Sequence, residues 1–407
     1  MSKTILVIGT LDTKGTEFAY VRDLITGRGH KALVMDTGVG IVGKPAFEAD
    51  IRAEEVAAAG GGSLAEMQEK RDRGTALEIM GKGAKELALK LHAEGKIDGV
   101  ISLGGSGGTS IATTAMKALP VGFPKVMVST MASGDVSPYV DVKDVTMMYS
   151  VVDVAGLNRL SRQIFANAVG AVCGMAEQTV PAGEDKPLIT ATMFGVTTPC
   201  VNAVREKLEA NGYEVLVFHA TGSGGRAMES LIEAGFIAGV ADITTTEWCD
   251  ELVGGVLSAG PNRLEAAAKA GIPQVVSLGA LDMVNFGAMD TVPEKFKDRL
   301  LYKHNPSVTL MRTIPEETAQ LGKIIAEKLN QTTGPTALFV PLKGVSMIDA
   351  EGQPFYMPEA DEALFQAIRD NLDTSKVELI ELDMHINDPE FAEAMANRLL
   401  EMLKSHQ

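Results

Sequence analysis

The chain has 407 residues and an acidic balance, with 37 lysines and arginines against 53 aspartates and glutamates, for a net charge of −16. This length exceeds what one hydrophobic core usually supports, so two domains are expected. The negative charge repels nucleic-acid phosphates and anionic membranes, so neither is an expected partner, and an anionic small molecule must be held by local amides and selected cations.

The first residues form too short an apolar run for a signal peptide, and no stretch approaches the roughly 20 apolar residues of a membrane span. A cytoplasmic location is therefore expected. The three cysteines, Cys173, Cys200 and Cys249, lie far apart and show no CxxC spacing. They predict buried free thiols rather than a zinc site or a disulfide framework.

Short runs rich in valine and isoleucine alternate with helical patterns along the chain, which is typical of βαβ units. The predicted strands are residues 4–9, 32–36, 99–103, 125–130, 188–194, 214–219, 239–243 and 274–278. They are apolar at nearly every position, as are strands of parallel sheets covered by helices on both faces. The predicted fold class is therefore α/β, with doubly wound, mostly parallel, Rossmann-like sheets.

Segments of the first half recur in the second half in the same order, which predicts two similar domains arising from duplication, with a cleft between them. Residues 28–38 resemble 211–222, 95–100 resemble 235–240, 122–130 resemble 271–279, and 146–150 resemble 309–313. The seam falls at 181–187, so the predicted domains are 1–183, which binds nucleotide or phosphate, and 184–407 on the substrate side.

The first domain has an insertion at about 39–94, which contains a capping-box pattern at Ser63 and Glu66. One interpretation is a lid over the phosphate site, with Arg71 or Arg73 as a clamp. The alternative is an edge decoration with solvated charges.

The segment 99–116 is predicted to form a buried strand, a glycine-rich loop and the start of a helix. The loop glycines are Gly104, Gly105, Gly107 and Gly108. Such glycines can adopt positive φ and let a ligand approach the backbone, while amides at the helix start attract negative charge. The loop lacks the Lys-Ser/Thr pair of a P-loop and the last glycine of a dinucleotide fingerprint. It predicts a phosphate site, with a plain strand-to-helix turn as the alternative.

The loop after the first strand and the loop after residue 129 should lie at the same sheet edge, where ligands of doubly wound sheets bind. Thr10, Thr13 and Lys14 are candidates to contact phosphate. Asp12 is a candidate to hold Mg²⁺ directly or through water, and Asp135 is a second candidate carboxylate for the metal.

Asp36 ends the second predicted strand, where it could take ribose hydroxyls or, equally, cap a turn. Further candidates for the nucleotide site are Ser106, Thr109, Ser129 and Thr130. Together these loops suit a nucleotide better than a bare sugar.

The second domain carries reactive side chains where the first has glycines. Arg226 follows Gly222 in a glycine-rich helix start and could bind a second anion. His219 could exchange protons with Glu229 or Glu247, although a lone histidine at a strand end is more often structural. His219, Arg226 and Glu247 are thus the candidate catalytic residues.

Six motifs in order resemble a known family. They are GTLDTKGTE at 9–17, GGSGGT at 104–109, MVSTMASGD at 127–135, MFGVTTPCV at 193–201, FHATGSGGRAME at 218–229 and DITTTE at 242–247. The chain resembles, over nearly its whole length, the family typified by the tomato protein that confers tomato mosaic virus resistance. The resemblance implies two Rossmann-like subdomains and ATP binding, mainly in the first, but no particular reaction. The plant protein continues into a further domain, so its antiviral role is not implied.

The first hypothesis is a Mg²⁺-dependent transferase or ATPase that binds ATP on residues 104–109, with an unidentified small-molecule substrate facing the second domain. The second is an isomerase or lyase that acts on a sugar phosphate or acid without ATP. The third is a nucleotide-regulated binding or inhibitor protein. The apolar helical pattern at 165–175 also favours a homo-oligomer, a dimer in the simplest case.

Overall fold

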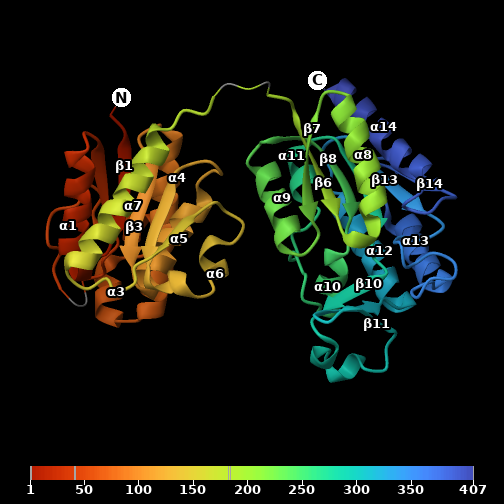
Figure 1. Ribbon diagram of the computed structural model, residues 1–407, viewed down its shortest axis with the longest axis horizontal. Helices are drawn as coiled ribbons and strands as arrows, with labels where there is room; N and C mark the ends of the chain where they lie inside the picture. The colour runs from red at the N-terminus through yellow and green to blue at the C-terminus, as the bar shows by residue number, and fades with distance from the viewer. Residues whose placement is uncertain (1, 41–42, 182, 184, 407) are drawn as a thin grey trace. The chain divides into compact units, whose positions relative to one another are not determined.

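The computed structural model describes residues 2–40, 43–181, 183 and 185–406. The chain divides into two compact units, Met1–Ala182 and Gly183–Gln407. Each unit is built on a parallel sheet with helices on both faces (Figure 1). The predicted α/β fold class, with doubly wound parallel sheets in two domains, is confirmed.

The first unit has a five-stranded parallel sheet in the order β2-β1-β3-β4-β5. Its strands are β1 (Thr4–Gly9), β2 (Lys31–Asp36), β3 (Gly99–Gly104), β4 (Lys125–Ser129) and β5 (Thr146–Tyr149). Its helices are α1 (Leu11–Gly27), α2 (Ala53–Ala59), α3 (Leu64–Lys70), α4 (Arg73–Ala93), α5 (Ser106–Ala118), η1 (Thr130–Ser133), α6 (Ser137–Val140) and α7 (Arg159–Glu177).

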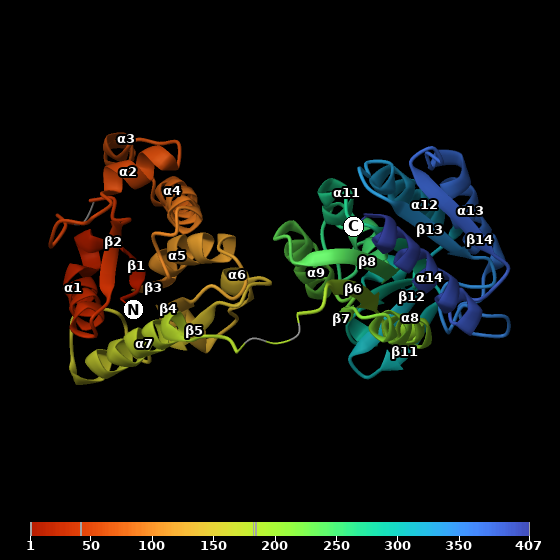
Figure 2. The same cartoon turned by 90° about the horizontal axis from the view of Figure 1, so that it is seen from above.

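Helices cover both faces of this sheet (Figure 2). Along β1, Leu6 and Ile8 pack against α2, α4 and α5 on one face. Ile5 and Val7 pack against α1 and α7 on the other face. Because both faces are covered, successive residues are apolar, which is why these strands could be predicted from their composition.

The segment predicted as an insertion at 39–94 holds α2, α3 and α4, and its boundaries need a correction. Helix α4 packs on the sheet beside α5 and is the crossover helix that a parallel connection from β2 to β3 requires. Only the part of this segment before α4, which contains α2 and α3, is an insertion into the βαβ unit. Helices α2 and α4 pack so closely that there is no room for a side chain at position 83. A Cβ on Gly83 would lie 1.9 Å from the carbonyl oxygen of Val56.

The second unit has a six-stranded parallel sheet in the order β14-β13-β9-β8-β6-β7 and a three-stranded antiparallel sheet in the order β10-β12-β11. Its strands are β6 (Leu188–Met193), β7 (Glu214–His219), β8 (Ile237–Thr244), β9 (Gln274–Gly279), β10 (Met283–Phe286), β11 (Leu301–Asn305), β12 (Val308–Arg312), β13 (Thr336–Pro341) and β14 (Val377–Leu382). Its helices are η2 (Gly195–Thr197), α8 (Thr198–Ala210), α9 (Ser223–Glu233), α10 (Glu247–Val253), α11 (Ala266–Ala270), η3 (Met289–Thr291), η4 (Glu294–Phe296), α12 (Pro315–Leu329), α13 (Pro358–Asn371) and α14 (Pro389–His406). Helices α8 and α14 cover one face of the larger sheet, while α9, α11, α12 and α13 cover the other.

The two large sheets share one strand order. Counted from its β7 end, the second sheet places β7, β6, β8, β9 and β13 where the first has β2, β1, β3, β4 and β5. Three of the four sequence correspondences are thereby confirmed. The fourth is wrong, because residues 146–150 contain the parallel strand β5, whereas 309–313 fall mainly in the antiparallel strand β12.

Two predictions from composition can also be compared with the structure. Cys173, Cys200 and Cys249 are buried free thiols, as predicted. Over the described part of the chain, no helix has both the length and the apolar character that crossing a bilayer requires.

Candidate functional site

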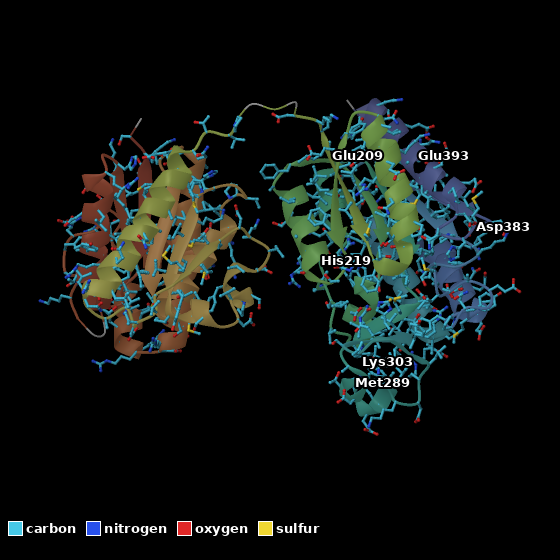
Figure 3. All side chains as sticks on the ribbon, in the orientation of Figure 1. Glu209, His219, Met289, Lys303, Asp383 and Glu393 are labelled. Carbon is cyan, nitrogen blue, oxygen red and sulfur yellow. The ribbon has the colours of Figure 1, made fainter. Side chains whose placement is uncertain are left out.

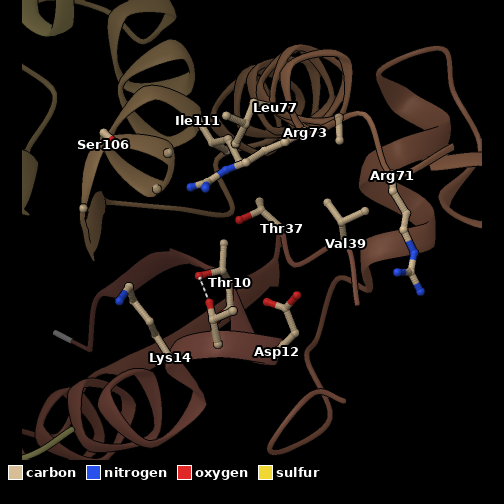
Figure 4. Close-up of a pocket in the computed structure, with 15 residues that line it drawn as sticks. Thr10, Asp12, Lys14, Thr37, Val39, Arg71, Arg73, Leu77, Ser106 and Ile111 are labelled. Atoms are coloured by element: carbon tan, nitrogen blue, oxygen red, sulfur yellow. Dashed lines mark hydrogen bonds between the residues drawn. The ribbon is translucent and has the colours of Figure 1, made fainter. Parts of the chain in front are cut away.

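The loops after β1 and β3 meet at the carboxyl edge of the first sheet, on the two sides of the point where the strand order reverses. In sheets with the order 2-1-3-4-5, ligands bind in the crevice at this switch point. A cavity of about 490 Å³ lies there, which we call the switch-point pocket (Figure 4). Its lining consists of Thr10, Asp12, Thr13, Lys14, Thr37, Val39, Arg71, Arg73, Ala76, Leu77, Gly105, Ser106, Gly107, Gly108 and Ile111.

Helix α5 begins directly after β3 and turns its first amides toward the pocket. Its N-cap, Gly105, has no side chain and makes no capping hydrogen bond. The amide of Thr109 donates to the carbonyl of Gly105 at 2.9 Å. The three earlier amides, those of Ser106, Gly107 and Gly108, therefore have no partner within the helix. Amides in this position attract anions.

The predicted glycine loop is shorter than expected, because α5 already starts at Ser106. The expectation of positive φ is wrong, since none of the four loop glycines, all of them described, has one. Their small size is what the structure requires. A Cβ on Gly104 would lie 3.2 Å from Cα of Gly108, and one on Gly107 would lie 3.4 Å from Nη2 of Arg73.

Helix α1 begins directly after β1 and brings a second N-terminus to the pocket. Its N-cap, Thr10, makes no side-chain capping bond and accepts a hydrogen bond at Oγ1 from Thr13 Oγ1 at 2.9 Å. The helix is distorted at Lys14 (φ −132°, ψ 27°), whose Nζ donates to the carbonyl of Val154. An ammonium carries three donors, so this contact leaves Lys14 able to bind an anion as well.

Of the three aspartates predicted for this edge, Asp12, Asp36 and Asp135, only Asp12 lines the switch-point pocket. Its Oδ2 accepts from the amide of Gly40 at 2.9 Å, while its buried Oδ1 has no hydrogen-bond partner. Asp36 is buried, and its Oδ1 accepts from the amides of Leu11 at 3.1 Å and Gly38 at 2.8 Å. Burial raises the pKa of Asp36. Asp36 therefore caps a turn, which is one of the two roles predicted for it.

Thr109 and Ser129 lie behind the pocket rather than in its wall. Thr109 Oγ1 lies 2.8 Å from the carbonyl oxygen of Gly105 and 2.6 Å from Ser129 Oγ, and both side chains are fully buried. These contacts hold the first turn of α5 against the end of β4.

The loop after β4 does not supply the predicted second metal ligand to the pocket. Asp135 is exposed and accepts from the amide of Ser137 at 2.9 Å. Hydrogen bonds from Ser137 lower the pKa of Asp135. Neither Asp135 nor Thr130 lines the pocket. Within the described residues, no group of three or more metal-ligating side chains is placed to hold a metal.

Two arginines and an apolar wall complete the pocket on the side of α4. Arg73 is the first residue of α4 and extends toward the first turn of α5, whereas Arg71 follows α3 on the far side of Val39 (Figure 4). Neither takes part in any ion pair that joins arginines to carboxylates in the described residues. The apolar wall consists of Val39, Ala76, Leu77 and Ile111.

The candidate catalytic residues of the second unit do not form an acid–base site. His219 is at the surface of this unit, and its ring stacks on Phe194 with the centroids 5.3 Å apart (Figure 3). Arg226 is exposed, and its Nη1 lies 3.4 Å from the carbonyl oxygen of Ser258. The two glutamates expected as proton partners of His219 are instead occupied by other donors.

Glu229 and Glu247 belong to a buried cluster around Arg263, which we call the Arg263 cluster. Arg263 is 1% exposed and contacts Glu247 at 2.7 Å, Asp242 at 2.5 Å and Glu229 at 3.2 Å. Burial raises the pKa of Glu229. Glu247 is itself 1% exposed and paired with Arg263, so it is not available to exchange protons with His219 as predicted. Arg263 was not predicted as a site residue, because it lies in an irregular segment with no motif.

The fold and the site define a parallel α/β protein of two units, with a candidate anion site at the switch point of the first sheet. Comparison with known proteins narrows this class. The chain belongs to the Uncharacterised protein family (UPF0261), whose N-terminal domain matches residues 3–181 and whose C-terminal domain matches 186–403.

Relatives in this family match most of the chain. A UPF0261 protein of Clostridium tetani is 58% identical over 405 residues, which are 99% of this chain and 100% of that protein. The ToMV resistance protein Tm-1(GCR237) of Solanum lycopersicum is 45% identical over 339 residues, 81% of this chain and 45% of that protein. The predicted family resemblance is confirmed.

A solved Streptomyces glycosyltransferase, SsfS6, matches 98% of this chain and 96% of its own at 14% identity, with a TM-score of 0.19. A likeness at that level supports no inference about function.

Proposed function

We propose that the first unit binds ATP in the switch-point pocket. The observation that carries this proposal is the convergence of two helix N-termini and Arg73 on one cavity at the switch point of the sheet. Each N-terminus contributes a partial positive charge, and the two charges add where the helices meet. Helix α5 also offers unpaired amides, whereas the Leu11 amide of α1 already donates to Asp36.

The phosphates would contact the amides of Ser106, Gly107 and Gly108. Arg73 would pair with them from α4, and Lys14 would add charge from α1. In a chain with a net charge of −16, a cavity lined by Lys14, Arg71 and Arg73 with Asp12 as the one carboxylate among its described lining residues supports an anionic ligand there.

The base would lie along the apolar wall formed by Val39, Ala76, Leu77 and Ile111. A plain phosphate or a small phosphorylated acid would leave this wall uncovered. The volume of about 490 Å³ also falls in the range of roughly 300–1,000 Å³ that is usual for small-molecule sites.

Asp12 would position Mg²⁺ on the phosphates. Its buried Oδ1 has no partner, which is costly unless a ligand or cation satisfies it. Among the lining residues that the structure describes, Asp12 carries the only carboxylate. That suits Mg²⁺, which keeps several waters and binds through one or two carboxylates and the phosphates.

Titration of the whole protein with ATP, ADP, AMP and sugar phosphates, with and without Mg²⁺, tests the proposal. Calorimetry should show ATP binding, and ATP at 100 times its dissociation constant should stabilise the protein by about 2.7 kcal/mol. Equal binding of sugar phosphates would favour an isomerase or lyase. Tight ATP binding without phosphate release would favour a regulated binding protein. No binding of ATP at millimolar concentration would overturn the proposal.

A Gly107→Val substitution should weaken ATP binding at least tenfold, because its methyl groups would enter the pocket between Arg73 and Leu77. The matched control is Gly170→Val. Gly170 is also a helical glycine, with open space where its Cβ would lie, but it is outside the pocket. Calorimetry should show normal affinity for the control, and equal affinities for the two variants would contradict this use of the pocket.

Arg73→Ala should lower the affinity for ATP by roughly tenfold, the size of one charge-assisted hydrogen bond. Arg71→Ala removes the same charge from the far side of Val39 and should have a smaller effect. The ADP affinity of each variant shows whether the loss depends on the terminal phosphate. Equal losses in the two arginine variants would indicate only long-range attraction.

A further inference from the structure

In the second unit, corresponding elements surround the position that the switch-point pocket has in the first. Strand β8 takes the place of β3, and α10 follows β8 as α5 follows β3. Helix α9 precedes β8 as α4 precedes β3. The first residue of α5 is Ser106, whereas the first residue of α10 is Glu247. The second unit thus has a carboxylate where the first has a short hydroxyl side chain.

The Glu247 carboxylate lies at the N-terminus of α9 and accepts its amides. Glu247 Oε1 receives hydrogen bonds from the amide of Gly222 at 2.7 Å and from that of Gly225 at 3.0 Å. A Cβ on Gly225 would lie 2.2 Å from Glu247 Oε2, so the absence of a side chain there makes room for the carboxylate.

The second oxygen of this carboxylate meets a cation. Glu247 Oε2 accepts from Arg263 Nε at 2.7 Å, and Arg263 is shared with Asp242 and Glu229. Two amides at a helix N-terminus together with a guanidinium are the groups that bind a free carboxylate or phosphate. Glu247 makes the contacts that an anionic ligand would make.

We infer that Glu247 is a built-in anion that occupies the second unit's equivalent of the switch-point pocket. The chain therefore binds one nucleotide, not two, because the side chain of Glu247 fills the second binding site. Removing its carboxylate opens a site for a small oxyanion on Gly222, Gly225 and Arg263. The stoichiometry rests on the proposed function, whereas the oxyanion site does not.

The experiment uses full-length protein with Gly107→Val as background, so that the first unit's pocket is blocked. Two variants are made in this background: Glu247→Ala and, as the isosteric control, Glu247→Gln. The melting temperature of each variant and of the Gly107→Val parent is measured in sodium acetate, sodium phosphate and sodium chloride at equal ionic strength. The single tryptophan, Trp248, adjoins residue 247 and reports unfolding of this unit. Wild-type protein is titrated with ATP to obtain the stoichiometry.

Acetate or phosphate at ten times its dissociation constant should raise the melting temperature of the alanine variant by roughly 3–5 °C over chloride. The melting temperatures of the glutamine variant and of the Gly107→Val parent should rise by less than about one degree, because the side chain of residue 247 still fills the site. ATP should bind the wild type with a stoichiometry of one.

A folded alanine variant without anion-specific stabilisation would overturn the inference. If that variant does not fold, Glu247→Ser is refolded with acetate, and failure of both variants in the presence of the anion would overturn it too. A stoichiometry of two for ATP would do the same. Absence of ATP binding would refute the proposed function and leave the anion experiment valid.

Discussion

Replacing Arg263 with methionine is expected to lower the free energy of unfolding of the second unit by about 3–5 kcal/mol. The substitution keeps a long apolar side chain but leaves Glu229, Asp242 and Glu247 buried without their common cation. Burying an uncompensated charge costs far more than losing a surface ion pair. Urea denaturation followed by Trp248 fluorescence gives the free energy directly.

The matched control is Arg398→Met. Arg398 lies in the same unit and pairs with Glu378 and Glu401, but its side chain is 34% exposed. Surface ion pairs contribute roughly 0–1 kcal/mol, so this change should have a small effect. A loss below 1 kcal/mol for Arg263→Met would show that the Arg263 cluster does not hold the unit together.

The second unit is expected to lose stability as the pH rises from 6.5 to 8.5, because a buried carboxyl there keeps its proton. Asp349 is fully buried, and its Oδ1 lies 3.1 Å from Nη2 of Arg312. Burial, followed by the charges of Asp282 and Asp361, raises the pKa of Asp349 to about 9. The unfolded chain releases this proton near the ordinary value of 3.8.

The direction of this pH dependence follows from the number of protons that each state binds. Between these two pKa values the folded state holds one more proton than the unfolded state, so raising the pH favours unfolding by up to about 1.4 kcal/mol per pH unit. Over the two pH units from 6.5 to 8.5, the loss is on the order of 2 kcal/mol. Urea unfolding at several pH values, followed by Trp248 fluorescence, measures it.

Asp349→Asn keeps the shape of the side chain and removes the titration, so it should flatten the pH dependence in this window. Asp282, whose pKa is raised to about 6 by burial, contributes mainly at lower pH. A wild-type stability that stays constant or rises between pH 6.5 and 8.5 would contradict a protonated Asp349.

All eight strands predicted from the sequence exist, because parallel strands covered on both faces are apolar at nearly every position. Most of the strands that were not predicted differ from this pattern, but β13 fits it and was still missed, since it is parallel to both its neighbours and buried along its whole length. Strand β5 is a half-buried edge strand of four residues. Strands β10, β11 and β12 form an antiparallel sheet, so no crossover helix separates them.

Residues adjacent to strand ends could be placed in the pocket from the sequence, since the carboxyl ends of parallel strands meet at one edge. Thr10, Asp12 and Gly105 follow this rule. Leu77 and Ile111 could not be assigned to the pocket by this rule. They line it because α4 packs beside α5, which the sequence does not show. The ion pair between Glu247 and Arg263 could not be predicted from a motif either, because it depends on the path of the irregular segment that contains Arg263.

The backbone contact between α2 and α4 has a consequence for the rate at which a ligand enters. With Val56 and Gly83 at backbone distance, α4 cannot tilt without carrying α2, and Arg73 has a fixed base. On this side, the pocket is therefore formed before the ligand arrives. We therefore expect ATP to associate in a single phase whose observed rate rises linearly with concentration, without the plateau that a slow opening step would impose.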